Sequence, residues 1–226
     1  MKFDKRLASR EGSIEHLEWL KNFYLKKIKQ AKNKEELAGE IAGKISSLEQ
    51  EAIRDRLTGA FNRGFVGAML GREIELERER GYGLGVMMID IDFFKSINDE
   101  EPDGHAAGDR TLIEIVKLLQ EVAGKHAVVG RWGGEEFLVV LPTVSEDSLF
   151  EVAVDIGQSV AGWLAGRAKL VRPKLTVSMG VRLTNEGETE ANVVGSTDQL
   201  LYKAKESGRA RMVMIKEGKE VVVKFE

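Results

Sequence analysis

The stretch RWGGEEFLVV, residues 131–140, places two adjacent glycines and two adjacent glutamates directly before an apolar run. Residues 127–132 and 137–141 read as strands, so the pattern predicts a β-hairpin that turns around GGEE. Glycine permits close backbone approach to a ligand and supplies positive φ in tight turns. Paired glycines also occur in purely structural turns, but two like charges beside one strand are unfavourable unless a cation shares them. The hairpin therefore predicts Glu135 and Glu136 as metal ligands.

A second carboxylate pair ends the apolar strand of residues 84–91. The sequence there is MMIDIDFFK, and strand alternation places Asp90 and Asp92 on the same face. Packing gives no reason for a buried strand to end in two carboxylates, so we expect Asp90 to bind metal. For Asp92, capping of the following helix is an equal alternative. Mg²⁺ often takes one or two carboxylates together with substrate phosphates.

Cationic side chains available to phosphate are Lys95, Lys205 and Arg209. Together with the two carboxylate pairs they predict a nucleoside triphosphate, metal ions and phosphoryl transfer. The sequence contains no GxxxxGK[ST] loop and none of the kinase HRD and DFG motifs, which excludes the commonest classes of NTPase.

Composition and charge further limit the functions and the cellular locations that we expect for this chain. The chain has 226 residues, no cysteine and a net charge of −3. Residues 1–54 carry 12 basic and 9 acidic residues, net +3; the totals of 34 and 37 leave 22 and 28 for residues 55–226, net −6. An acidic domain predicts no nucleic-acid binding. Without a long apolar run or a signal-like N-terminus, we expect no membrane span and a cytoplasmic location.

The remaining pattern predicts an α/β or α+β domain with one central sheet, because strands and helices alternate. Expected elements are helices at 65–80, 106–123, 146–165 and 197–207, a strand at 175–183, and a final hairpin turning at Glu217-Gly218.

The first 54 residues read as two amphipathic helices, at 13–31 and from Lys34 onward, with Asn33 and Glu36 resembling a capping box. Their apolar stripes predict either a stalk that pairs two chains or a helical hairpin packed on the chain's own catalytic domain. We expect domains at 1–54 (dimerisation or regulation) and 55–226 (catalysis).

Six segments, in the family's order along the chain, resemble the GGDEF-domain diguanylate cyclases. DRLTGAFNR (55–63) is similar to the family's DxLTxxxNR, MIDIDFFKSIND (88–99) to its metal- and base-binding segment, and GHAAGD (104–109) to its GHxxGD. GGEEF (133–137) is similar to the family signature, LTVSMGV (175–181) to its later strand, and DQLLYKAKESGRAR (198–211) to its LYxAKxxGRNR closing helix. The resemblance implies a nucleotidyl-cyclase or palm-like fold with an antiparallel-mixed sheet. It also implies synthesis of cyclic di-GMP from two GTP with release of two pyrophosphates.

The family's residue roles follow position by position. Two Mg²⁺ or Mn²⁺ ions per half site would be held by Asp90, the carbonyl of Ile91, Glu135 and Glu136, with Glu135 assisting deprotonation of the 3′-hydroxyl. Gly133 and Gly134 would admit the nucleotide, and Asn98 and Asp109 would bind the guanine edge. The triphosphate would be lined by Phe93, Phe94 and Lys95 and held by Lys205 and Arg209. Catalysis would require a homodimer, with an upstream partner acting through residues 1–54.

Departures from the family concern regulation and base selection. GKHA at 124–127 stands where an inhibitory RxxD product site is common, so we expect no inhibition through that site. EEPD at 100–103 lengthens the loop before GHAAGD, and Gly64 stands where a second Arg is common. Asp109 argues against the mixed cyclic GMP–AMP product. The alternatives are a catalytically silent GTP-binding regulator and a plain dimerisation module, although the latter leaves the paired carboxylates unexplained.

Overall fold

The computed structural model describes residues 22–23, 25–27, 34–81, 83–100, 104–167 and 175–225. The chain divides into two compact units, residues 1–52 and 53–226, and each is described by itself. In the first unit, helix α2 (Lys34–Ile53) matches the second of the two predicted helices. Most of the predicted helix at 13–31, together with Asn33, lies outside the described residues. No helix in the described ranges is long and apolar enough to cross a membrane.

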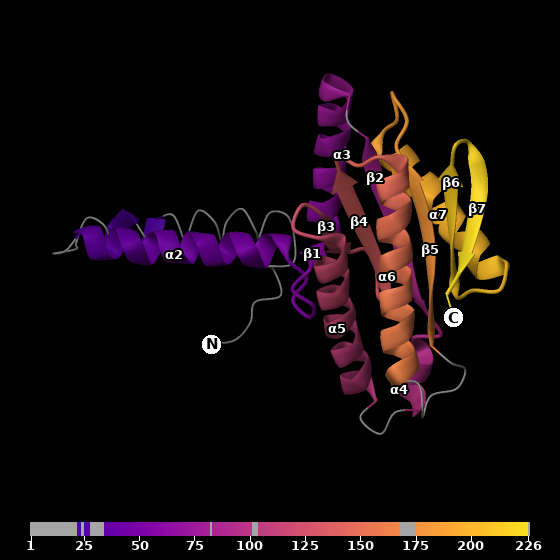
Figure 1. Ribbon diagram of the computed structural model, residues 1–226. Coiled ribbons are helices and arrows are strands. Elements are labelled where there is room, and N and C mark those ends of the chain that lie inside the picture. Colours follow the sequence, from indigo (N-terminus) through magenta and orange to yellow (C-terminus); the bar gives the residue numbers. More distant parts are fainter. Residues whose placement is uncertain are drawn as a thin grey trace. The chain divides into compact units, whose positions relative to one another are not determined.

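The second unit is a seven-stranded mixed sheet flanked by helices (Figure 1), as the sequence predicted. The strand order is β1-β3-β4-β2-β5-β6-β7; only β1–β3 and β5–β6 pair in parallel. The strands are β1 (Phe61–Asn62), β2 (Leu84–Asp92), β3 (Val128–Arg131), β4 (Glu136–Pro142), β5 (Thr176–Leu183), β6 (Arg211–Lys216) and β7 (Lys219–Lys224). The helices are α3 (Arg63–Arg80), α4 (Lys95–Glu100), α5 (His105–Ala123), α6 (Glu146–Arg167) and α7 (Glu190–Glu206).

Strand β2 is the central strand of the sheet, and all nine of its residues are buried. It pairs antiparallel with β4 on one side and with β5 on the other. In this register Asp90 lies opposite both Glu136 and Ser178. The apolar run LGVMMIDI therefore brings one carboxylate to the GGEE hairpin.

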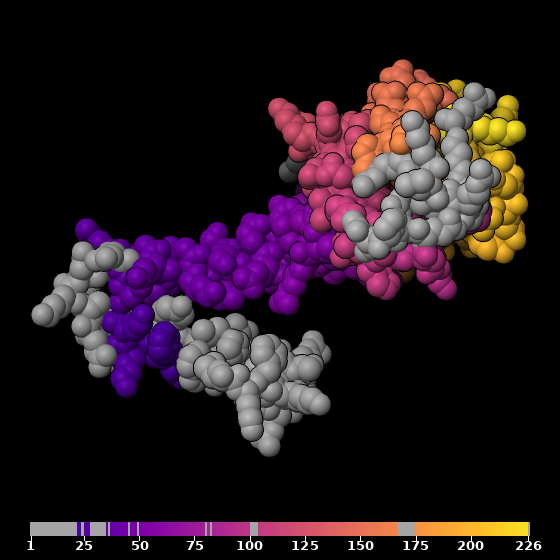
Figure 2. Space-filling model, turned by 90° about the horizontal axis from the view of Figure 1, so that it is seen from below, coloured from indigo at the N-terminus to yellow at the C-terminus, as the bar shows by residue number. Residues whose placement is uncertain are grey.

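The two faces of β2 carry different helices. Met87, Ile89 and Ile91 belong to a core that includes buried residues of α5 and α6, whereas Val86 and Met88 pack with apolar residues of α3 and α7. Helices α5 (pink) and α6 (orange) lie next to each other in Figure 2. Strand alternation therefore places Asp90 and Asp92 on the face that α7 covers.

Several boundaries differ from those predicted. Helix α7 begins at Glu190, seven residues before the predicted start, because Thr189 caps it by accepting a hydrogen bond from the Asn192 N–H. The short elements β1 and α4 were not predicted, since two or six residues carry too little periodicity. The final hairpin turns at Glu217 and Gly218 as predicted, with positive φ at both.

Candidate functional site

The GGEE turn connects β3 to β4 as a tight loop. The backbone N–H groups of Trp132 and Gly133 both donate to the carbonyl of Glu136. Neither Gly133 nor Gly134 has positive φ, so this turn does not use the left-handed backbone that glycine permits. A Cβ at Gly133 would lie 2.5 Å from a carboxylate oxygen of Glu136, the far end of a flexible side chain that can move aside. Gly134 has no atom within 4 Å of such a Cβ, so this position is open.

Arg131 fixes the outer end of this turn. Its Nε and Nη2 donate to the carbonyl of Gly134 at 3.1 and 2.7 Å, and its Nη1 lies 3.1 Å from Oδ1 of Asp55. Asp55 also accepts hydrogen bonds from the backbone and hydroxyl of Thr58. Burial alone would raise the pKa of Asp55, but the hydrogen bonds from Thr58 and Arg131 outweigh it and hold that pKa below its usual value.

Sequence reasoning missed this tether. Its two ends are 76 residues apart in the chain. The signal was available, because Asp55 opens the DRLTG segment and Arg131 precedes the glycine pair.

Asp90 is the central carboxylate of the site. Its side chain is only 8% exposed, and Lys205 Nζ lies 2.9 Å from its Oδ2. The backbone N–H of Ile91 donates to the carbonyl of Glu135 at 3.3 Å, which joins the end of β2 to the turn. The pKa of Asp90 is raised to about 6, chiefly by burial; Lys205 opposes the rise, and the charges of Glu135 and Asp92 add to it. This carboxylate is therefore costly to ionise unless a second cation joins Lys205.

Asp92 is a structural acceptor and caps no helix. Its carboxylate accepts hydrogen bonds from the hydroxyls of Thr176 and Ser178 and, at 3.3 Å, from the backbone N–H of Ala210. The Nε of Arg209 lies 3.7 Å from the Oδ1 of Asp92. The helix-capping alternative is thus wrong, and Asp92 joins β2, β5 and the segment after α7.

Lys205 and Arg209 reach the two aspartates from the end of α7. The helix ends at Glu206, and Arg209 lies beyond it with a left-handed φ of 60°, so the two do not share a helix face. The Arg209 guanidinium lies over the ring of Phe93, 5.0 Å from its centroid, and Phe93 is 41% exposed. Helix α7 packs directly on β5 at Gly180. A Cβ added there would lie 2.3 Å from the carbonyl oxygen of Thr197, so only glycine allows this approach.

The other predicted substrate residues lie around α4 and α5. Phe94 is buried in the main core, so its side chain is not available to a ligand, whereas Lys95 is exposed at the start of α4. Asn98 packs against Gly108, where a Cβ would lie 2.3 Å from the Asn98 Oδ1. Asp109, the next residue of α5, is exposed. The two predicted base-binding residues thus come from adjoining helices, and residues 101–103 between these helices are outside the described ranges.

The donor set fits a hard divalent cation. Asp90 and Glu135 interact as like charges, and carboxylate oxygen is the ligand type that Mg²⁺ prefers. Within the described ranges, no three His, Asp or Glu side chains are gathered tightly enough to form a metal cage. Mg²⁺ usually binds through one or two carboxylates and completes its shell with water and phosphate, so this partial set suits it.

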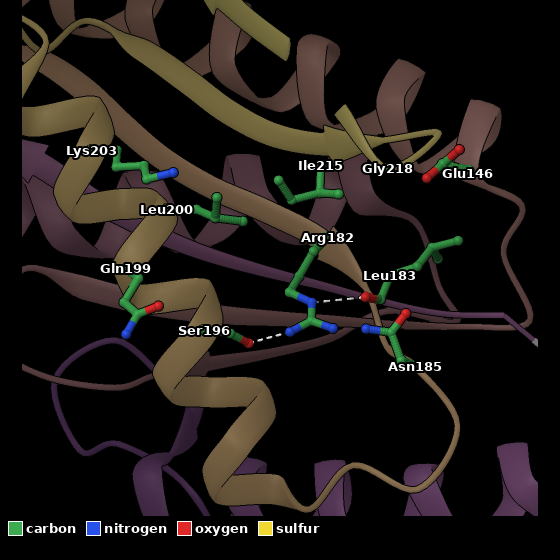
Figure 3. A pocket seen from close by; sticks show the side chains of 10 residues that line it. All are labelled: Glu146, Arg182, Leu183, Asn185, Ser196, Gln199, Leu200, Lys203, Ile215 and Gly218. Carbon is green, nitrogen blue, oxygen red and sulfur yellow. Dashed lines mark hydrogen bonds between the residues drawn. The ribbon is translucent and has the colours of Figure 1, made fainter. Parts of the chain in front are cut away.

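A pocket of about 430 Å³ lies elsewhere, between α7 and the β6–β7 hairpin (Figure 3). Its charged groups are paired with protein: Arg182 donates to the carbonyl of Leu183, to Ser196 and to Glu188, and Lys203 pairs with Glu220. None of the predicted site residues lines it. Two of the predicted phosphate-binding residues, Lys205 and Arg209, instead line an open pocket of about 620 Å³ at the end of α7, together with Tyr202 and Glu206.

Comparison with known proteins agrees with this geometry. Residues 52–211 match the family model described as "Diguanylate cyclase, GGDEF domain", and the chain belongs to this family. It is 37% identical over 141 residues to diguanylate cyclase A of Treponema denticola, covering 61% of this chain and 37% of the relative. It is 34% identical over 167 residues to the response regulator PleD of Caulobacter vibrioides, covering 72% and 36%. The chain thus spans little more than a third of the length of these relatives.

The solved structures that resemble this chain include members of the same family. The diguanylate cyclase SiaD, solved in complex with its activator SiaC from Pseudomonas aeruginosa, is 31% identical with a TM-score of 0.65, over 90% of this chain and 77% of that one. The active GGEEF domain of a diguanylate cyclase from Vibrio cholerae is 31% identical with a TM-score of 0.56, over 66% and 92%.

Proposed function

We propose that this chain is a diguanylate cyclase, which condenses two GTP into cyclic di-GMP and releases two pyrophosphates. The observation that carries the proposal is the Asp90–Lys205 pair beside the GGEE turn. A buried carboxylate with a raised pKa, a second carboxylate next to it and a cation within 3 Å form a site for a metal–phosphate complex. Family membership and the names of the relatives support the same activity.

The metal ligands in this proposal are Asp90, the carbonyl of Ile91, Glu135 and Glu136. Bound Mg²⁺ or Mn²⁺, two per half site, would neutralise the triphosphate and lower the pKa of the attacking 3′-hydroxyl. Glu135, in the turn, would assist deprotonation of that hydroxyl.

The chain's own cations and backbone hold the nucleotide. Lys205 and Arg209 would bind the outer phosphates, together with Lys95, the exposed Phe93 and the main chain of Phe94. Asn98 and Asp109 would hold the guanine edge, and Gly133 and Gly134 keep the turn open to the substrate. Because this arrangement contains one nucleotide site, catalysis requires a second copy whose bound GTP faces the first. Residues 1–54 would bring two copies together or transmit a signal from a partner.

The test is product identification. The purified chain is incubated with Mg²⁺ and either GTP alone or GTP with ATP, and the products are identified by mass. Cyclic di-GMP from GTP is expected; a mixed dinucleotide would overturn the role of Asp109. GTP binding without any product would support the alternative of a silent, GTP-binding regulator.

The dimer proposal has a separate test. Removal of residues 1–50 should lower the rate per enzyme much more at low than at high protein concentration, because pairing then depends on mass action. A rate per enzyme that does not depend on concentration, with or without these residues, would contradict this role.

A further inference from the structure

Tyr202 is an exposed aromatic residue beside the proposed phosphate site. It is 59% exposed, and its ring belongs to none of the apolar clusters. Its hydroxyl donates to Oε1 of Glu206 at 2.6 Å, one helical turn further along α7. Both residues line the open pocket that contains Lys205 and Arg209. The side chain is therefore held by a polar contact within this pocket.

Glu206 is an unfavourable residue in a phosphate site. Its carboxylate repels a triphosphate and can pair with a cation that the triphosphate needs. Glu206 precedes Arg209 by three residues in the chain, and both line the same open pocket. In the structure Arg209 instead lies over Phe93 and near Asp92.

The hydrogen bond from Tyr202 holds the Glu206 carboxylate toward the N-terminal end of α7. Residues four apart are stacked on one helix face, with Tyr202 on the side of the helix N-terminus. Its hydrogen bond therefore draws Glu206 back along α7, away from Arg209. The same hydrogen bond and the charge of Glu206 raise the pKa of Tyr202, so the hydroxyl remains a donor throughout the neutral range.

We propose that Tyr202 is a positioning residue, which restrains the Glu206 carboxylate so that Lys205 and Arg209 remain available to the phosphates of GTP. The inference rests on the proposed function, since it assigns the outer phosphates to these two cations. It gives a role to a tyrosine and a glutamate that the predicted site does not include.

The experiment is a double-mutant cycle with Tyr202→Phe, Glu206→Gln and the double variant. Binding is measured by calorimetry with Mg²⁺ and 3′-deoxy-GTP, which keeps the triphosphate but lacks the attacking hydroxyl. Steady-state kinetics with GTP separates KM from kcat. Glu121→Gln, which removes an exposed charge on α5, controls for net charge.

Tyr202→Phe should raise both Kd and KM about threefold to tenfold, with kcat within about twofold of wild type, because only phosphate binding is weakened. Glu206→Gln alone should not weaken binding, and the double variant should return to the wild-type Kd. Unchanged binding in Tyr202→Phe at an unchanged Tm would overturn the inference. A double variant as weak as Tyr202→Phe would also overturn it, since the tyrosine would then act without Glu206. Failure of the wild type to bind 3′-deoxy-GTP would instead refute the proposed function.

Discussion

Replacing Asp90 by Asn should make the metal-free protein more stable while removing its activity. The Asp90 carboxylate is 8% exposed and its pKa is about 6, against 3.8 for a free side chain. Burial is the largest cause of this rise, and Lys205 offsets it only in part. The folded state therefore tolerates the charge of Asp90 poorly, and the neutral amide of Asn does not incur this cost.

The magnitude follows from linkage. An acid whose pKa is raised on folding binds its proton more tightly in the folded state, so stability falls as the pH rises from the unfolded pKa to the folded pKa. A rise of about two units corresponds to about 3 kcal/mol at full ionisation. The cost of Asp90 is absent below about pH 4, grows between pH 4 and 6, and is complete above pH 6. Since Asn leaves Lys205 without a charged partner, we expect a gain of about 2 kcal/mol, or roughly 4–8 °C in Tm.

The assay is thermal unfolding in EDTA from pH 4 to pH 8. Asp90→Asn should match the wild type near pH 4 and exceed it at pH 8, and added Mg²⁺ with 3′-deoxy-GTP should stabilise the wild type more than the variant. Asp92→Asn is the matched control: Asp92 accepts hydrogen bonds from Thr176, Ser178 and the Ala210 N–H, so its loss should cost about 1–3 kcal/mol. An Asp90→Asn variant less stable than the wild type at pH 8 would refute the reasoning.

Other predictions concern the turn and the end of α7. Arg131→Lys should lower turnover about tenfold or more, because one ammonium cannot bind both the Gly134 carbonyl and Asp55; an unchanged kcat would show that the tether does not hold the turn. Ala210 has a φ of 51°, which asparagine tolerates better than alanine, so Ala210→Asn should raise Tm by about 2–3 °C; a lower Tm in calorimetry would contradict this. Glu136→Gln should abolish turnover with the circular dichroism spectrum unchanged, and full activity at saturating Mg²⁺ would exclude Glu136 as a ligand.

Local pattern was enough to predict most of the elements. The hairpin around GGEE, the buried strand that ends at Asp90 and the final turn at Glu217 follow from periodicity and turn chemistry, which are properties of neighbouring residues. The early start of α7 was missed because Thr189 and Glu190 precede an apolar stripe that is weak in its first two turns.

By itself, the sequence determined the family, the order of the elements and the residue types available for the proposed chemistry. It did so because motif spacing and hydrophobic periodicity are recorded along the chain. Only the tertiary structure decided which groups meet: Lys205 with Asp90, Arg131 with Asp55, and Asp92 with the hydroxyls of β5. These contacts depend on strand register and on how closely α7 packs on β5, and both are set by the whole core.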